Sequence, residues 1–228
     1  MPTSMEIIFL IVAVALGAAL GLLLGSNKLL NKLLLTFSGA YLLGVNIAEV
    51  FPSLYTSDLA ASKIGLFVLL GILIQIILEG ITKGAEHGHL HSKDHEVFPI
   101  SVFLGLFIHA LIEGVPLQRP DGHNLLWAIL IHKVPVAMVL FVFLSKSKLS
   151  SFKIGIFMLL FALASPIGYI VGNYLPPHLL TYALALAAGV FLHISTVIIF
   201  ESVEGHKLKF KKLSMVVLGF LLAIIFSH

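Results

Sequence analysis

Eight long apolar segments separated by short polar connections constrain this chain more than any other feature of its sequence. They cover roughly residues 6–25, 33–56, 63–83, 98–118, 124–145, 152–174, 180–203 and 211–227. A helix needs about 20 mainly apolar residues to cross the hydrocarbon core of a bilayer. Backbone polar groups in that core must be satisfied within the protein, which favours helices. We therefore predict an all-α polytopic membrane protein with eight transmembrane helices in a single transmembrane domain, residues 1–228, the last helix being the shortest.

Composition excludes the soluble alternative. Hydrophobic residues make up 59% of the chain, charged residues 11%, and the mean hydropathy is +1.08. A soluble globular domain has about 25% charged residues. The apolar composition indicates the lipid bilayer as a partner. The net charge of +3 is small and lies mostly in the connections, so it suggests no nucleic-acid partner. The N-terminus lacks the basic region and cleavage site of a secretory signal, so we expect the first apolar segment to be a retained span.

The distribution of lysine and arginine predicts the orientation in the membrane. The connections after the first, third, fifth and seventh segments carry eleven lysines, whereas the opposite side carries only Lys63 and Arg119. Cytoplasmic connections are the ones enriched in these residues. We therefore expect both termini to be extracytoplasmic. The expected location is the cell membrane, as a multi-pass protein of the kind found in the bacterial inner membrane.

The third connection, residues 84–97, is predicted to be a cytoplasmic histidine-rich loop. Its imidazoles alternate with carboxylates and belong to His87, His89, His91 and His95. Short histidine-rich tracts are typical of weak metal binding. The alternative is a solvated polar linker that is rich in histidine by chance.

The fourth apolar segment contains two residues that are costly to place in a membrane, His109 and Glu113. A charged side chain at the centre of a bilayer costs about 2.5 kcal/mol or more, so such residues indicate a function. Their spacing of four places them on one helix face, one turn apart. A neutral imidazole and an ionised carboxylate are two ligands for a divalent metal. Because the chain has no cysteine, such a metal would be held by nitrogen and oxygen ligands, which suit zinc, iron or manganese.

The fifth segment repeats the layout of the fourth. Glu113 stands three residues before Pro116, and His132 stands three residues before Pro135. A proline leaves the carbonyl four residues earlier without its helical donor, so we expect both helices to be loosened beside these side chains. Consecutive spans run antiparallel, so the two loosened turns can face each other.

We therefore predict that His109, Glu113 and His132 converge on one metal ion, with water or Glu49 completing its shell. The same three residues would also suit a proton relay. Lys133 follows His132, and burial disfavours a lone ammonium group. We expect Lys133 either to pair with a carboxylate, of which Glu113 is the nearest, or to face a water-filled cavity.

Three further polar residues are given structural interpretations. Glu79 and Glu201 lie near cytoplasmic ends of their segments and are expected to reach lipid headgroups. His193 is expected to make an interior polar contact rather than to bind metal.

At these residues the chain resembles the ZIP (ZRT/IRT-like) family of divalent metal transporters. The family pattern His-Asn-x-x-Glu-Gly of span 4 stands here as residues 109–114, with the sequence HALIEG. The span-5 pattern His-Glu-x-Pro-His stands as residues 132–136, with the sequence HKVPV. The resemblance covers the whole chain and includes eight spans, external termini and a histidine-rich loop between spans 3 and 4. It implies a ZIP-like bundle.

The departures from the family pattern fall together at the positions that bind a second metal in the family. Family members with two metals use three positions around the second metal, and these are Ala110, Lys133 and Ser165 here. All three have lost the expected ligand. The resemblance therefore implies that the second metal site is absent and that the charge of Lys133 stands in its place.

The resemblance implies a transporter that moves a divalent metal, zinc before Fe²⁺, Mn²⁺ or Cd²⁺, into the cytoplasm. Transport would proceed by alternating access through a site between helices 4 and 5, with the metal as substrate. The alternative is a non-transporting membrane metal sensor or a ZIP relative with another cargo. An enzyme is disfavoured, because a metallohydrolase needs a general base beside its metal-bound water and the chain has no His-Glu-x-x-His motif. A homodimer is left open.

Overall fold

The computed structural model describes residues 3–25, 27–82, 99–119, 123–201 and 210–226. Over these ranges the chain forms helices and connecting turns, and no strand, which confirms the predicted all-α class. The elements are α1 (Thr3–Leu24), α2 (Lys28–Val45), the π-helical turn η1 (Asn46–Val50), α3 (Phe51–Tyr55), α4 (Ala61–Thr82), α5 (Pro99–Gly114), the 3-10 turn η3 (Val115–Gln118), α6 (His123–Lys146), α7 (Ser151–Asn173), α8 (Pro177–Glu201) and α9 (Phe210–Phe226).

Seven helical runs among the described residues are long and apolar enough to cross a membrane. The second of them, Lys28–Tyr55, joins α2, η1 and α3 into one span. The eighth predicted span corresponds to α9, whose 17 residues stand at the lower end of the range for a crossing helix. The polytopic membrane fold is therefore confirmed. The last span is the shortest, as predicted, when α5 and η3 are counted as one span, although α5 alone has 16 residues.

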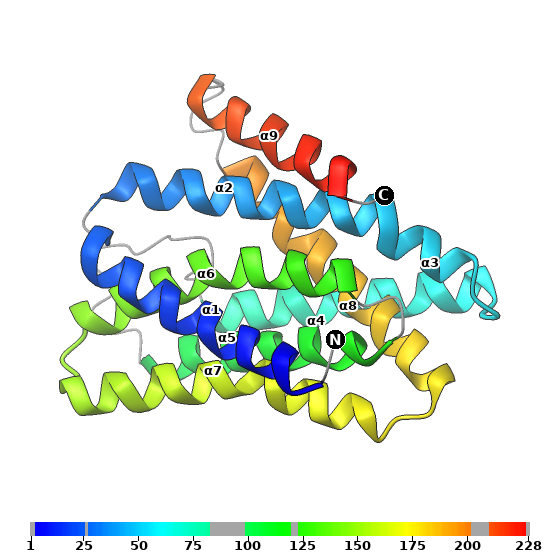
Figure 1. The fold of residues 1–228 in the computed structure, drawn as a ribbon, viewed down its shortest axis with the longest axis horizontal. Coiled ribbons are helices and arrows are strands. Elements are labelled where there is room, and N and C mark those ends of the chain that lie inside the picture. Colours follow the sequence, from blue (N-terminus) through cyan, green and yellow to red (C-terminus); the bar gives the residue numbers. More distant parts are fainter. Residues whose placement is uncertain (1–2, 26, 83–98, 120–122, 202–209, 227–228) are drawn as a thin grey trace.

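The long helices lie side by side in one bundle (Figure 1). The first residues of α1 and the end of α9 lie toward the same end of the bundle, as an even number of crossings requires. α9 packs on α2 at the edge of the bundle, whereas α6 is the most buried of the candidate spans. The predicted metal ligand on α6, His132, therefore lies in the interior of the bundle.

Glycines bring α7 close to α5. A Cβ atom added at Gly114 would lie 2.2 Å from the carbonyl oxygen of Ser165, and one added at Gly168 would lie 2.1 Å from that of Leu111. Real Cβ atoms do not approach backbone this closely. Because glycine has no side chain, the backbones of α5 and α7 can touch at these positions. The turn of α7 that carries Ser165 therefore packs against the turn of α5 that carries Glu113.

The two prolines of the repeated layout act differently. α5 ends at Gly114 and tightens into the 3-10 turn that contains Pro116. α6 instead runs without interruption from His123 to Lys146 with Pro135 inside it. The sequence predicted a loosened helix in both places, but only the first proline coincides with a change of helix type.

A guanidinium group connects three segments at the end of the bundle predicted to be external. Arg119 Nη1 donates a hydrogen bond to Thr181 Oγ1 of α8 at 2.8 Å, and Nη2 donates one to Ser53 Oγ of α3 at 3.1 Å. At another position the hydroxyl of Tyr169 on α7 donates to Glu6 Oε2 on α1. Hydrogen bonds between polar side chains therefore hold the helices together in addition to apolar packing.

Candidate metal site

α5 places His109 and Glu113 on one face, as their spacing predicted. His109 Nε2 lies 3.5 Å from Glu113 Oε2, and only 3% and 2% of the two side chains are exposed. Both residues are enclosed by the bundle rather than by lipid, since the neighbouring turn of α5 packs in an apolar cluster with α6, α7 and α8. Two groups able to bind a metal are thus held a few ångströms apart in a water-poor interior.

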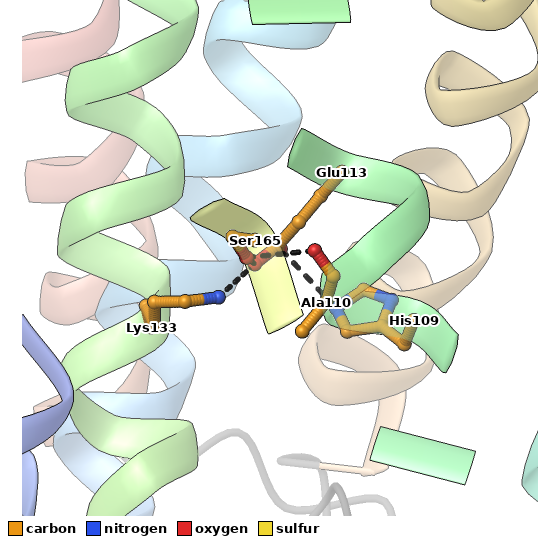
Figure 2. A network of polar contacts seen from close by, with 5 residues as sticks. All are labelled: His109, Ala110, Glu113, Lys133 and Ser165. Carbon is orange, nitrogen blue, oxygen red and sulfur yellow. Dashed lines mark hydrogen bonds and ion pairs between the residues drawn. The ribbon is translucent and has the colours of Figure 1, made fainter. Parts of the chain in front are cut away.

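α6 contributes Lys133, whose ammonium group forms an ion pair with Glu113 Oε1 (Figure 2). The sequence predicted this partner if Lys133 was buried, and the structure confirms it, since only 1% of the lysine side chain is exposed. Taking both charges out of water costs free energy that the pair regains only with good geometry and further hydrogen bonds. The pair leaves Oε2 as the oxygen of Glu113 that faces His109.

α7 completes the surroundings of the ion pair. The Ser165 hydroxyl lies 2.7 Å from the carbonyl oxygen of Ala110 and 2.9 Å from Glu113 Oε1. A hydroxyl has one hydrogen to donate, so these two acceptors share it. The ammonium of Lys133 also lies 5.2 Å from the centre of the Phe161 ring, within reach of a cation–π interaction. The sequence interpretation had missed Phe161, which looked like one more apolar residue of its span.

The three positions that depart from the ZIP pattern therefore meet in space. The Lys133 ammonium and the Ser165 hydroxyl contact the Glu113 carboxylate, and the Ala110 carbonyl oxygen accepts from the same Ser165 hydroxyl (Figure 2). The sequence could list them as replacements, but it did not predict that Ser165 and Lys133 would bind the same carboxylate oxygen.

His132 lies on α6 next to Lys133 and is 2% exposed. Its ring stands edge-on to that of His109, with 6.1 Å between ring centres. Within the described ranges, no group of three or more His, Cys, Asp or Glu side chains is placed to hold a metal ion in this conformation. The structure thus brings His109 to Glu113 and places His132 beside them, but the predicted three-residue shell is not closed.

Glu49, the predicted additional ligand, lies in the π-helical turn of the second span. Its Oε1 atom is buried, and within the described part of the chain it has no hydrogen-bond partner. π-helical turns are frequent at functional sites. Its part in metal binding stays a prediction.

A second polar pair was not anticipated. Glu79 Oε2 of α4 lies 2.6 Å from His193 Nε2 of α8. The expectation that Glu79 reaches lipid headgroups is therefore wrong, because its carboxylate turns inward to an imidazole, whereas His193 makes the interior polar contact that we expected. Sequence could not reveal the pair, since it depends on how the third and seventh spans align. The side chain of Glu201 and the loop histidines His87, His89, His91 and His95 lie outside the described residues.

Comparison with known proteins identifies the family. The family model described as ZIP Zinc transporter matches residues 82–227, which is more than half of the chain. The chain is therefore a multi-pass membrane protein that belongs to the ZIP family.

Two relatives show how low the sequence identity to known family members is. Zinc transporter ZIP9 of Xenopus tropicalis is 28% identical over 165 residues, which cover 62% of this chain and 53% of that protein. Protein zntD of Dictyostelium discoideum is 27% identical over 147 residues, 54% of this chain and 22% of that protein. The chain thus spans about half or less of the length of these relatives.

Proposed function

We propose that this chain transports a divalent metal ion, zinc in the first place, into the cytoplasm through a site between α5 and α6. Membership of the ZIP family and the zinc transporter named among its relatives support the substrate class. Alternating access is the mechanism that fits a site buried from both sides of the membrane. The family relationship also favours transport over intramembrane hydrolysis.

The observation that carries the proposal is the spacing of His109 Nε2 and Glu113 Oε2, 3.5 Å. Zinc binds histidine nitrogen and carboxylate oxygen at about 2.0–2.2 Å with tetrahedral geometry, which requires about 3.4 Å between two ligand atoms. The two atoms therefore stand where two corners of a zinc tetrahedron would lie. His132, whose ring is edge-on to His109, supplies a third ligand after a side-chain rotation, and water supplies the fourth.

Lys133 has a defined part in this proposal. Its ammonium binds Oε1 of Glu113, whereas the proposed metal binds Oε2. A carboxylate can accept at both oxygens, so the metal and Lys133 can share Glu113. The lysine then takes the place of a second metal ion and keeps the site mononuclear. A shell with three protein ligands and an open position also suits a cargo that must leave again.

The test is zinc uptake into proteoliposomes that contain purified protein. His109→Ala removes one corner of the proposed tetrahedron, and we expect uptake to fall to the level of empty liposomes. His178→Ala is the matched control, because that histidine is exposed near the start of α8 and should leave uptake unchanged. Equal uptake by His109→Ala and wild type would rule out the assigned site.

A second candidate function, a non-transporting metal sensor or a relative with another cargo, is favoured by one observation. The Glu113 charge is already neutralised by Lys133, which weakens attraction for a divalent cation. Metal that binds and exchanges on one face of sealed proteoliposomes without accumulating inside would support this candidate instead.

Replacing Lys133 by aspartate tests whether the lysine substitutes for a metal. We expect Lys133→Asp to bind an additional zinc ion per chain, because a carboxylate would then stand beside Glu113. Elemental analysis of the purified variant and of wild type measures this. An unchanged zinc content would show that the lysine does not occupy the place of a second metal.

A further inference from the structure

Arg119 is the one arginine of the chain, and its guanidinium joins three elements at the end of the bundle predicted to be external. Nη1 donates to Thr181 Oγ1 of α8 at 2.8 Å, and Nη2 donates to Ser53 Oγ of α3 at 3.1 Å. The residue itself follows η3, the turn that continues from the helix of Glu113. A guanidinium presents its donors in a fixed planar fork, so one side chain can hold two hydroxyls at once.

This three-way contact lies beyond the candidate metal site, toward the predicted external end. Arg119 stands six residues after Glu113, which places it about 10 Å farther along α5 and η3. Ser53 stands four residues after Glu49 on the second span, so these two lie on one helix face, one turn apart. The His109 and Glu113 side chains are exposed by 3% or less in this conformation. The guanidinium is therefore positioned across the external approach to the buried groups.

The elements that Arg119 joins are otherwise held to different partners. A Cβ added at Gly172 would lie 2.3 Å from the carbonyl oxygen of Val115, so α7 and η3 are in close backbone contact. A Cβ added at Gly189 would lie 2.0 Å from the carbonyl oxygen of Val68, so α8 and α4 are in close contact as well. Among the glycines of the described ranges, none brings η3 into such contact with α3 or α8. The two hydrogen bonds of Arg119 therefore join parts that can separate without breaking close backbone packing.

We propose that Arg119 is an external latch, a side chain that holds η3 against α3 and α8 and closes the buried site on the external side until its two hydrogen bonds break. This inference rests on the proposed function, because it concerns the path of the same metal to that site. Hydrogen bonds from a charged donor are stronger than bonds between neutral groups, so the latch keeps the site closed. Both bonds end on neutral hydroxyls, which water can replace, so the latch can open during transport. While it is closed, its positive charge repels an approaching divalent cation.

The test uses the absence of native cysteine. Glu49→Cys places a single thiol one turn deeper than Ser53, and a membrane-impermeant methanethiosulfonate reagent is added outside intact cells that express the full chain. In this parent variant we expect Arg119→Ala to speed labelling of the thiol about tenfold, the change in an opening equilibrium when one hydrogen bond to a charged group is lost. Lys63→Ala is the matched control, because it removes the same charge from the same end of the bundle and leaves the latch in place. Its labelling should stay at the parent rate.

Further variants separate the fork of Arg119 from its charge. Arg119→Lys keeps the charge, but an ammonium lacks the fork that holds two hydroxyls, so labelling should still be faster than in the parent. Ser53→Ala combined with Thr181→Val leaves Arg119 in place and removes both acceptors, so it should reproduce the effect of Arg119→Ala. This double variant keeps the test decisive if Arg119→Ala folds poorly.

Labelling at the parent rate in both Arg119→Ala and the double acceptor variant overturns the latch. Absence of labelling in every variant also overturns it, since a released latch must admit the reagent to the Glu49 turn. Zinc uptake by His109→Ala, measured separately, distinguishes this inference from the proposed function. Unchanged labelling together with lost uptake in His109→Ala contradicts the latch alone, whereas faster labelling together with full uptake in His109→Ala contradicts the buried site alone.

Discussion

Glu113→Gln is expected to destabilise the folded protein by about 3–5 kcal/mol, the usual cost of leaving one member of a buried ion pair without its partner. The carboxylate accepts from Lys133 and from the Ser165 hydroxyl through the same oxygen. Glutamine keeps the shape but removes the negative charge, so the ammonium would remain in the bundle interior with only neutral groups nearby, namely the new amide, the Ser165 hydroxyl and an aromatic ring. Chemical denaturation in detergent, followed by circular dichroism, measures the change in unfolding free energy.

A double variant isolates the ion pair from the general effect of altering the core. Lys133→Met removes the ammonium with a side chain of similar length, and Glu113→Gln combined with Lys133→Met leaves no buried charge at this position. We expect the double variant to recover most of the stability lost by Glu113→Gln, because interacting residues are not additive. Additive losses would contradict the importance of the ion pair. Zinc uptake should stay abolished in the double variant, since Oε2 no longer carries the charge that the metal needs.

Gly168→Ala is expected to cause the second large effect. The new methyl group would lie 2.1 Å from the carbonyl oxygen of Leu111 and 3.2 Å from the Cα of Gly114. Both neighbours are backbone, so α5 and α7 must move apart. Overpacking of a core typically costs 1–3 kcal/mol, and we expect a value near the upper end. The movement would also draw Ser165 away from Ala110 and Glu113, so zinc uptake should fall with the melting temperature.

Gly155→Ala on the same helix is the matched control. An added Cβ there meets no atom within 4 Å, and replacing a helical glycine by alanine at a compatible position stabilises by about 0.4–1 kcal/mol. Its melting temperature should therefore equal or exceed that of wild type, with unchanged uptake. A similar response of both variants would show that close approach of α5 and α7 does not limit stability.

Much of the fold could be predicted because membrane insertion is a property of local sequence. Hydrocarbon leaves the backbone few choices, so the long apolar runs predicted helices at the positions where α1, α4 and α8 occur, with boundaries that differ by a few residues. The helical period also placed His109 and Glu113 on one face. The local effect of proline was less certain, because Pro135 lies inside an unbroken α6. Neighbouring helices in a bundle can satisfy the carbonyl that a proline leaves free.

The sequence by itself determined the class of protein, the pair His109–Glu113 and the presence of an ammonium beside His132, since these follow from hydropathy, helical period and residue identity. Only the tertiary structure decided which carboxylate oxygen Lys133 binds, that Ser165 binds it too, and that Glu79 meets His193. These contacts join residues 20, 52 and 114 positions apart. They depend on how the helices align and how closely the glycines let them approach, which the hydrophobicity of each span does not encode.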